Sequence, residues 1–214
     1  SKYFTTDVLE FYNKVNFMKA AIAYSDAITT VSQSYADEIL TASFGCGLDG
    51  FLRYHKNKLT GIINGIDNEH FTPSHDKLLE YPFANLTEKK LNKKSYLKEK
   101  SLKGITKPLF IFIGRFTQQK GVDLLINSLE QIASSDCNIA ILGDGEEIYQ
   151  EKIMKIVNEY DNIHFEFKYN EVLSHQMYAA ADFLLMPSLF EPCGLNQMIA
   201  MSYGSIPIVH KVGG

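Results

Sequence analysis

Two positively charged side chains stand close together in a short segment between a strand-like and a helix-like stretch. The segment is GRFTQQKG, residues 114–121, with Arg115 and Lys120 as the cations and glycine at both ends. A guanidinium binds phosphate oxygens through two hydrogen bonds, a lysine adds a point charge, and the start of a helix attracts anions. The segment therefore suits a diphosphate. Two surface cations beside a turn would give the same local pattern, so that alternative stays open.

A second segment places a carboxylate between a strand-like and a helix-like stretch. In MPSLFEPCGLNQ, residues 186–197, Glu191 could accept hydrogen bonds from sugar hydroxyls, and the amides of Gly194 and Leu195 could face an anion at the helix start. Alternatively, Glu191 only complements the dipole of the helix. A lone glutamate would favour the second interpretation, whereas the neighbouring Pro-Cys-Gly turn favours the first.

Two glycine-rich turns are weaker candidates for ligand contacts. Gly143 opens a Gly-Asp-Gly turn, a type that is common wherever strands and helices alternate, and Gly213 and Gly214 could offer further backbone amides. Taken alone, neither turn would indicate a ligand.

The sequence from Pro108 onward alternates between apolar strand-like stretches and helix-like ones. The predicted strands are 109–113, 138–142, 162–167, 183–186 and 206–209, and the predicted helices between them are 122–133, 147–160, 172–181 and 195–203. This alternation indicates a Rossmann-like α/β fold, with a parallel sheet covered on both faces. Such sheets bind ligands at the carboxyl ends of their strands, which is where all the candidate segments lie.

Before Pro108 the pattern is less regular. A helix near residues 16–22, a strand at 27–31 and a second helix with Ser32 as its N-cap are predicted, followed by a strand at 59–63. The lysine-rich stretch 89–100 is either an anion-binding patch or a solvated helix with a linker. We favour the solvated helix, because exposed lysines are usual on helices.

Composition and charge exclude some classes of partner. The net charge of −4 over 214 residues gives no electrostatic reason to expect nucleic acid or an anionic membrane, and no apolar run reaches the roughly 18 residues of a membrane span. The three cysteines, Cys46, Cys137 and Cys193, form no C-x-x-C pair. They support neither a zinc site nor disulfides and favour a reducing, cytoplasmic location. Since no initiator methionine is present, we expect the N-terminus of the natural protein to lie upstream.

The two candidate ligand-binding segments, 114–121 and 186–197, resemble those of bacterial glycogen synthases and plant starch synthases. Residues 16–34, GLDG at 47–50 and GIINGID at 61–67 are also similar to that family, in the same order, and EPCGLNQ at 191–197 is the most specific part. The resemblance implies a GT-B fold, in which two Rossmann-like domains enclose the active site. It also implies a retaining transfer of glucose from ADP-glucose to the non-reducing end of an α-1,4-glucan, without a metal or other cofactor.

The resemblance implies roles for residues at matching positions. Arg115 and Lys120 would hold the diphosphate and stabilise the departing ADP, whose negative charge grows in the transition state. Glu191 would bind the glucose hydroxyls. The remaining donor contacts would be Asn64, Gly114, Gly143, Cys193, Gly194, Leu195, Gly213 and Gly214. None of these residues is a conventional nucleophile, so no covalent intermediate is expected.

The resemblance also implies a division of the chain. Residues 1–60 would be the end of the acceptor-side domain, and residues 61–214 a truncated nucleotide-sugar-binding domain. The family's other donor loop, most of its acceptor domain and its closing helix lie outside this sequence, so we expect the 214-residue chain alone to be inactive. The expected location is the cytoplasm, or a plastid if the chain is from a plant. The oligomeric state is not predicted.

Two departures from the wider pattern bear on the alternatives. Ile199 stands where many retaining GT-B enzymes have a second glutamate, and Val212 replaces a common threonine. Glycogen synthases also lack that glutamate, so Ile199 argues against the first alternative, another GT-B hexosyltransferase with a UDP or GDP sugar donor. The second alternative is a non-catalytic sugar-nucleotide or glucan-binding module. The intact Arg115, Lys120 and Glu191 argue against it.

Overall fold

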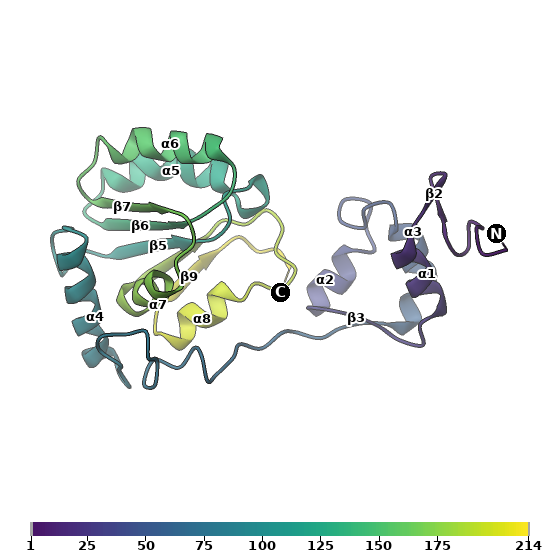
Figure 1. Cartoon of the computed structure of the whole chain (residues 1–214), viewed down its shortest axis with the longest axis horizontal. Helices are drawn as coiled ribbons and strands as arrows, with labels where there is room; N and C mark the ends of the chain where they lie inside the picture. Colours follow the sequence, from purple (N-terminus) through teal and green to yellow (C-terminus); the bar gives the residue numbers. More distant parts are fainter. Residues whose placement is uncertain (1, 214) are drawn as a thin grey trace. The chain divides into compact units, whose positions relative to one another are not determined.

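The structure, a computed structural model, describes residues 2–213 as parts of two compact units (Figure 1). The first unit extends to Asn64 and also includes Val212 and Gly213, and the second is Gly65–Lys211. Whether the first unit is the end of an acceptor-side domain stays a prediction.

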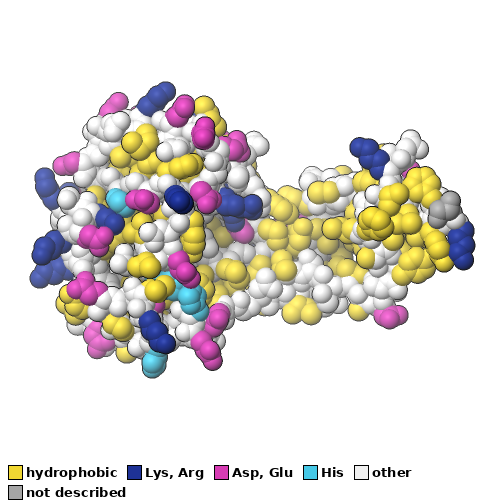
Figure 2. Space-filling model, viewed as in Figure 1, with side chains coloured by type: hydrophobic (Ala, Val, Ile, Leu, Met, Phe, Trp, Pro, Cys, Tyr) yellow, Lys and Arg dark blue, Asp and Glu magenta, His cyan; other side chains and the backbone are white. Residues whose placement is uncertain are grey.

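The first unit consists of short elements around a small core. They are β1 Glu10–Phe11, β2 Lys14–Val15, α1 Phe17–Tyr24, β3 Ile28–Thr30, α2 Gln33–Glu38, α3 Asp49–Tyr54, the 3-10 helix η1 Lys56–Lys58 and β4 Leu59–Gly61. Strands β3 and β4 pair in parallel. The predicted N-cap Ser32 is confirmed, since its Oγ accepts a hydrogen bond of 3.0 Å from the N–H of Tyr35. The core cannot cover every apolar side chain, and Figure 2 shows hydrophobic atoms gathered on the surface of this unit.

The second unit is built on one five-stranded parallel sheet. Its strands are β5 Leu109–Ile113, β6 Asn138–Gly143, β7 Ile163–Phe167, β8 Phe183–Met186 and β9 Ile206–Val209, in the order β7-β6-β5-β8-β9. Its helices are α4 Leu86–Glu99, η2 Gln118–Lys120, α5 Val122–Ala133, α6 Glu147–Val157, α7 Glu171–Ala180 and α8 Asn196–Ser202. The predicted strands and helices after Pro108 are confirmed to within a few residues at their ends, and so is the Rossmann-like class.

Both faces of this sheet are covered, as the apolar strands predicted. Along β6, Ile139 and Ile141 pack into the core formed with α5 and α6, whereas Ala140 and Leu142 pack into the core formed with α4 and α7. Figure 1 shows α5 and α6 on one side of the sheet and α7 and α8 on the other. This alternation follows from the period of two in a strand. Within residues 2–213, no helix is both long and apolar enough to span a membrane.

The strand order reverses at β5. Strand β6 lies on one side of β5 and β8 on the other. The segments that follow β5 and β8 therefore start from neighbouring strands, at the same edge of the sheet. These are the segments 114–121 and 187–195, which include most of the residues singled out for their chemistry.

The lysine-rich stretch forms the helix α4, but the prediction that it is solvated is wrong for two of its lysines. Lys89 and Lys93 are only 7% and 8% exposed. The Nζ of Lys89 donates to Tyr203 O at 2.6 Å and to Ser205 Oγ at 2.9 Å. Lys93 Nζ lies 2.6 Å from Asp182 Oδ2. Long aliphatic stems allow both lysines to be buried while each ammonium finds polar partners.

The burial of Lys89 makes stability depend on pH. Burial lowers its pKa from 10.5 to about 8, in spite of the nearby Asp182. Between these values the unfolded chain holds a proton that the folded chain has lost, so the free energy of unfolding rises with pH, by up to about 1.4 kcal/mol per pH unit. A Lys89→Met variant lacks this proton. We therefore expect wild type to gain stability relative to Lys89→Met between pH 8 and pH 10 in urea unfolding.

A matched control is Lys90→Met, at an exposed lysine one residue further along α4. Its stability difference from wild type is expected to stay constant over the same pH range. A constant difference for Lys89→Met as well would contradict the lowered pKa.

Candidate functional site

An ion pair connects the two candidate ligand-binding segments, which follow β5 and β8. Lys120 Nζ lies 2.5 Å from Glu191 Oε2, and the same oxygen accepts a hydrogen bond of 2.9 Å from Ser188 Oγ. Both partners are largely buried, with side chains 21% and 12% exposed. Lys120 ends the 3-10 helix η2 after β5, and Glu191 follows β8. The reversal of strand order at β5 thus brings together two residues that are far apart in the sequence.

Backbone contacts hold the same two segments against each other. The N–H of Leu189 donates to Gln119 O at 2.9 Å, and Gln119 Nε2 donates to Phe190 O at 3.1 Å. Gly121 has a φ of +69°, and a Cβ on it would lie 2.0 Å from the carbonyl oxygen of Pro187. Only glycine allows this approach, because any larger residue would collide with the backbone.

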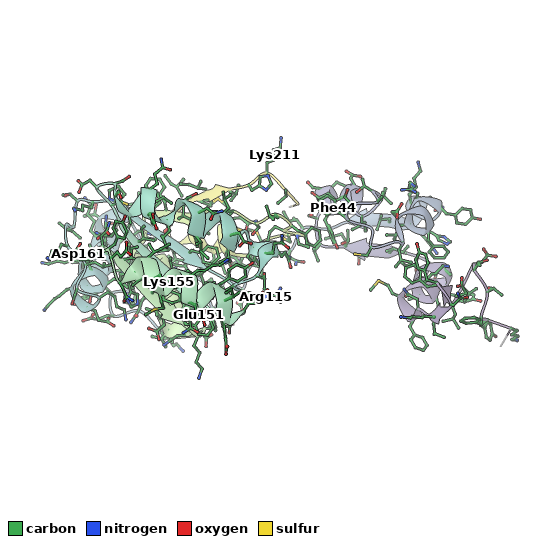
Figure 3. All side chains as sticks on the ribbon, turned by 90° about the horizontal axis from the view of Figure 1, so that it is seen from above. Phe44, Arg115, Glu151, Lys155, Asp161 and Lys211 are labelled. Atoms are coloured by element: carbon green, nitrogen blue, oxygen red, sulfur yellow. The ribbon has the colours of Figure 1, made fainter. Side chains whose placement is uncertain are left out.

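A cavity of about 360 Å³ opens beside Lys120, at the carboxyl ends of the strands. Five of its eight lining residues have polar or charged side chains, and the full lining is Ile113, Gly114, Arg115, Lys120, Gly143, Asp144, Tyr169 and Asn196. Arg115 is exposed, and in Figure 3 it lies at the opposite end of the second unit from Asp161, which precedes β7. The predicted residues Gly114, Arg115, Lys120 and Gly143 therefore surround one cavity.

Gly143 has a structural reason to be glycine as well as a place in the cavity. A Cβ on it would lie 1.8 Å from the carbonyl oxygen of Gly114. The turn after β6 is also tied to the segment after β5, since Phe116 N–H donates to Asp144 O at 2.5 Å and Glu146 N–H donates to Phe116 O at 3.1 Å. Close backbone packing thus shapes this wall of the cavity.

The predicted residues after Glu191 form the turn into α8. Cys193 and Gly194 are buried, and Gly194 has a φ of +77°. Leu195 is exposed at the N-cap position of α8, and no side chain caps this helix. None of the three lines the cavity of Arg115 and Lys120, so their contact with a donor stays a prediction.

The last three predicted residues are Asn64, Gly213 and Gly214. Asn64 is exposed at the end of the first unit. Gly213 belongs to the same unit, with its N–H donated to Glu38 Oε1 at 2.9 Å. Gly214 lies outside the described residues. Their roles as donor contacts stay predictions.

Sequence reasoning did not predict four of the residues that line the cavity, namely Ile113, Asp144, Tyr169 and Asn196. Tyr169 follows β7, and the rule that ligands bind at carboxyl ends of strands would have indicated it. The preceding Lys168 has a φ of +127°, an uncommon value for a residue other than glycine, and its N–H donates to Gly143 O at 2.7 Å. Asn196 Nδ2 donates to Ile113 O at 2.6 Å. That contact joins the start of α8 to the end of β5, and no sequence signal predicts it.

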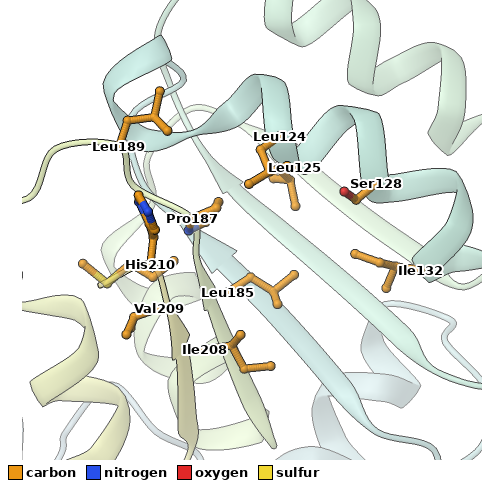
Figure 4. A pocket seen from close by; sticks show the side chains of 11 residues that line it. Leu124, Leu125, Ser128, Ile132, Leu185, Pro187, Leu189, Ile208, Val209 and His210 are labelled. Atoms are coloured by element: carbon orange, nitrogen blue, oxygen red, sulfur yellow. The ribbon is translucent and has the colours of Figure 1, made fainter. Parts of the chain in front are cut away.

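A second cavity of about 400 Å³ has a different character. It lies between α5 and strands β8 and β9, and Figure 4 shows the side chains that point into it. Its lining includes Leu124, Leu185, Ile208 and Val209, and His210 is its one ionisable side chain. Such a lining offers few groups for a charged or hydroxyl-rich ligand. The smaller, polar cavity is therefore the candidate functional site.

The polar cavity has the chemistry of an anion site. Arg115 and Lys120 provide two cations, and backbone amides of the glycine turns lie beside them. Glu191 neutralises Lys120 in this state. An anionic ligand that also has hydroxyl groups could replace Glu191 as the partner of Lys120. The carboxylate of Glu191 could then accept hydrogen bonds from those hydroxyl groups.

Family comparisons agree with this description. Residues 93–214 match the family model described as glycosyl transferases group 1. Residues 1–54 match the model described as the starch synthase catalytic domain.

The chain is similar to several curated proteins over almost its whole length. It is 44% identical over 210 residues to the glycogen synthase of Cellvibrio japonicus, which covers 96% of this chain and 44% of that protein. It is 43% identical over 216 residues to the glycogen synthase of Finegoldia magna, covering 99% of this chain and 46% of that protein. The chain thus spans less than half the length of these relatives.

A solved structure is also similar in three dimensions. The catalytic domain of starch synthase IV from Arabidopsis thaliana, solved with bound ADP and acarbose, matches with a TM-score of 0.93 and 38% identity. The match covers all of this chain and 45% of that one. The comparisons and the strand order together confirm the GT-B class and the resemblance to the glycogen and starch synthases.

Proposed function

Because the chain belongs to the group 1 glycosyl transferases, we propose that it binds the nucleotide-sugar donor in a retaining glucosyltransferase. The longer enzyme transfers glucose from ADP-glucose to the non-reducing end of an α-1,4-glucan such as glycogen or starch. The observation that best supports this proposal is the pairing of Arg115 and Lys120 in one cavity at the carboxyl ends of the strands. The similarity to a starch synthase domain solved with ADP and acarbose supports the same donor and acceptor.

In this proposal Arg115 and Lys120 hold the diphosphate of the donor. Both cations stabilise the charge that develops on ADP as its bond to glucose breaks. We propose that the transfer needs no metal ion, because two side-chain cations supply the positive charge at the diphosphate. Glu191 accepts hydrogen bonds from the glucose hydroxyls once Lys120 turns to the phosphates. Tyr169, 55% exposed at the cavity, offers an aromatic face for the nucleobase.

The remaining parts of the proposal concern the longer protein. Asn64, Gly213 and Gly214 are further proposed donor contacts, and Cys193, Gly194 and Leu195 are proposed to line the sugar. The enzyme acts in the cytoplasm, a location supported by the free thiols of Cys46, Cys137 and Cys193.

The first test is binding of nucleotides to the chain itself. Isothermal titration calorimetry with ADP, UDP and GDP is expected to give a lower Kd for ADP than for the other two. A second test uses a longer protein that contains this chain, with incorporation of labelled glucose into glycogen from ADP-glucose and from UDP-glucose. Incorporation from UDP-glucose alone would support the proposed site but show that the donor is UDP-glucose and not ADP-glucose. A folded protein that incorporates glucose from neither donor would favour a binding module.

A further inference from the structure

A second group of ionisable side chains lies outside the polar cavity. His70, Glu171 and His175 each offer one ligand atom, and these atoms lie within 4.8 Å of one another. His70 Nε2 is 3.0 Å from Glu171 Oε1. Glu171 and His175 stand four residues apart in α7 and so share one face of that helix. His70 belongs to the segment that precedes α4. In Figure 2, histidine and acidic side chains lie next to each other on the visible face of the second unit.

The imidazole of His175 is buried and held in one orientation. It is 1% exposed, and its Nδ1 lies 2.7 Å from Asp76 Oδ2. Asp76 is itself buried and also accepts a hydrogen bond of 2.5 Å from Tyr203 OH. Burial and this hydrogen bond raise the pKa of Tyr203, so its hydroxyl keeps its proton. Because the carboxylate can only accept, Nδ1 must be the protonated nitrogen, and Nε2 keeps a free lone pair.

The Nε2 atom of His175 has no hydrogen-bond partner among the described residues. A buried polar atom without a partner is costly, by about 1–3 kcal/mol. Such an exception calls for an explanation in a molecule whose other buried polar groups are mostly paired. His70 and Glu171, two potential metal ligands, lie in one cluster with this imidazole.

We propose that His70 Nε2, the Glu171 carboxylate and His175 Nε2 bind a Zn²⁺ ion. Two imidazoles and one carboxylate form a ligand set that zinc accepts, with water in the fourth position. Asp76 is the carboxylate behind a metal-bound histidine, which fixes the tautomer and makes the imidazole a better ligand. The imidazole nitrogens argue against Mg²⁺ and Ca²⁺, which prefer oxygen ligands.

To reach tetrahedral geometry, ligand atoms that are up to 4.8 Å apart must come closer together. Ligand atoms about 2.0–2.1 Å from a tetrahedral zinc ion lie roughly 3.3 Å from each other. His70 and Glu171 are already close to this separation, and their side chains are 42% and 57% exposed. His175 is fixed by Asp76, and Phe71 stacks on it with ring centroids 5.0 Å apart. The ion would thus tie the segment around His70 to the start of α7.

This site is independent of the proposed donor site. None of its three residues lines the cavity of Arg115 and Lys120, and its test does not depend on nucleotide binding. Without a metal ion, the contact between His70 and Glu171 would be an exposed side-chain pair that contributes little to stability.

The test is zinc titration of the whole chain after treatment with EDTA. The Cys46→Ser variant serves as the parent, since Cys46 is an exposed free thiol that could bind zinc by itself. Calorimetry with ZnCl₂ is expected to show one ion per chain and a higher Tm with zinc bound. His70→Ala and Glu171→Gln are each expected to weaken binding at least about tenfold. Both positions are exposed, so the fold should persist, as circular dichroism would check.

Two controls make the result specific. His75→Ala removes an exposed histidine of the same segment that is outside the cluster, and it is expected to bind zinc as the parent does. Co²⁺ in place of zinc is expected to give the visible absorption of a tetrahedral site, which His70→Ala abolishes. Absence of zinc binding, or binding that His70→Ala and Glu171→Gln leave unchanged, would overturn the proposal.

Discussion

Replacing Lys120 with alanine is expected to weaken ADP binding by roughly 10- to 100-fold, since hydrogen bonds to charged groups contribute about 1.5–3 kcal/mol. In the longer enzyme the expected loss of transfer is about 10²–10³-fold, because a fixed cation at a developing charge acts mainly in the transition state. Calorimetry with ADP and incorporation of labelled glucose measure the two effects. Lys155→Ala, at an exposed lysine of α6 labelled in Figure 3, is the matched control and is expected to change neither.

The single substitution also leaves Glu191 without its cation. Removing one partner of a buried pair costs about 3–5 kcal/mol, so Lys120→Ala alone could weaken binding by destabilising the fold. The double variant Lys120→Gln/Glu191→Gln removes both charges and leaves two side chains that can donate and accept hydrogen bonds in place of the ion pair. It is expected to remain folded and still bind ADP weakly. Wild-type ADP affinity in a folded double variant would contradict the phosphate role of Lys120.

Glu191→Gln separates the roles of the two partners. It removes the negative charge beside Lys120, so ADP binding is expected to stay the same or to tighten. Glucose transfer by the longer enzyme is expected to fall, because an amide is a weaker acceptor for sugar hydroxyls than a carboxylate.

Gly121→Ala is expected to destabilise the chain by about 3 kcal/mol or more. A left-handed φ costs an alanine about 1–2 kcal/mol, and its Cβ would lie 2.0 Å from the oxygen of Pro187, so one of the two segments must move. A loss of this size corresponds to a fall in Tm of roughly 6–12 °C for a protein of this length. Thermal unfolding measures it, and ADP binding should fall as well because Lys120 precedes Gly121.

Gly65→Ala provides the matched control. A Cβ on Gly65 would meet no atom within 4 Å, so we expect its Tm to stay close to that of wild type. Equal Tm values for Gly121→Ala and wild type would mean that the segments after β5 and β8 are not packed as closely as described.

Local patterns in the sequence were enough to predict the α/β class and most elements after Pro108. Apolar runs such as Leu109–Ile113 and the helical spacing of Val122–Ala133 are properties of neighbouring residues, and both elements form where predicted. The cations Arg115 and Lys120 were also recognisable, because their residue types and neighbouring glycines identify them as candidate phosphate-binding residues without a structure.

Burial was harder to predict than secondary structure. No pattern of apolar residues in α4 distinguishes its buried lysines from its exposed ones. Nevertheless, Lys89 and Lys93 are buried, whereas Lys90 is exposed. Their partners, such as Ser205 and Asp182, are more than 80 residues away in the sequence. A local pattern contains no information about such partners.

The sequence by itself determined which side chains could bind a diphosphate or a sugar, because those abilities belong to the residue types. Only the tertiary structure decided which of them meet. The reversal of strand order at β5 placed Lys120 2.5 Å from Glu191, and the packing of α7 set His175 beside His70, a residue in a stretch without regular secondary structure. Contacts of this kind depend on the global strand order and on helix packing, which no short window of sequence specifies.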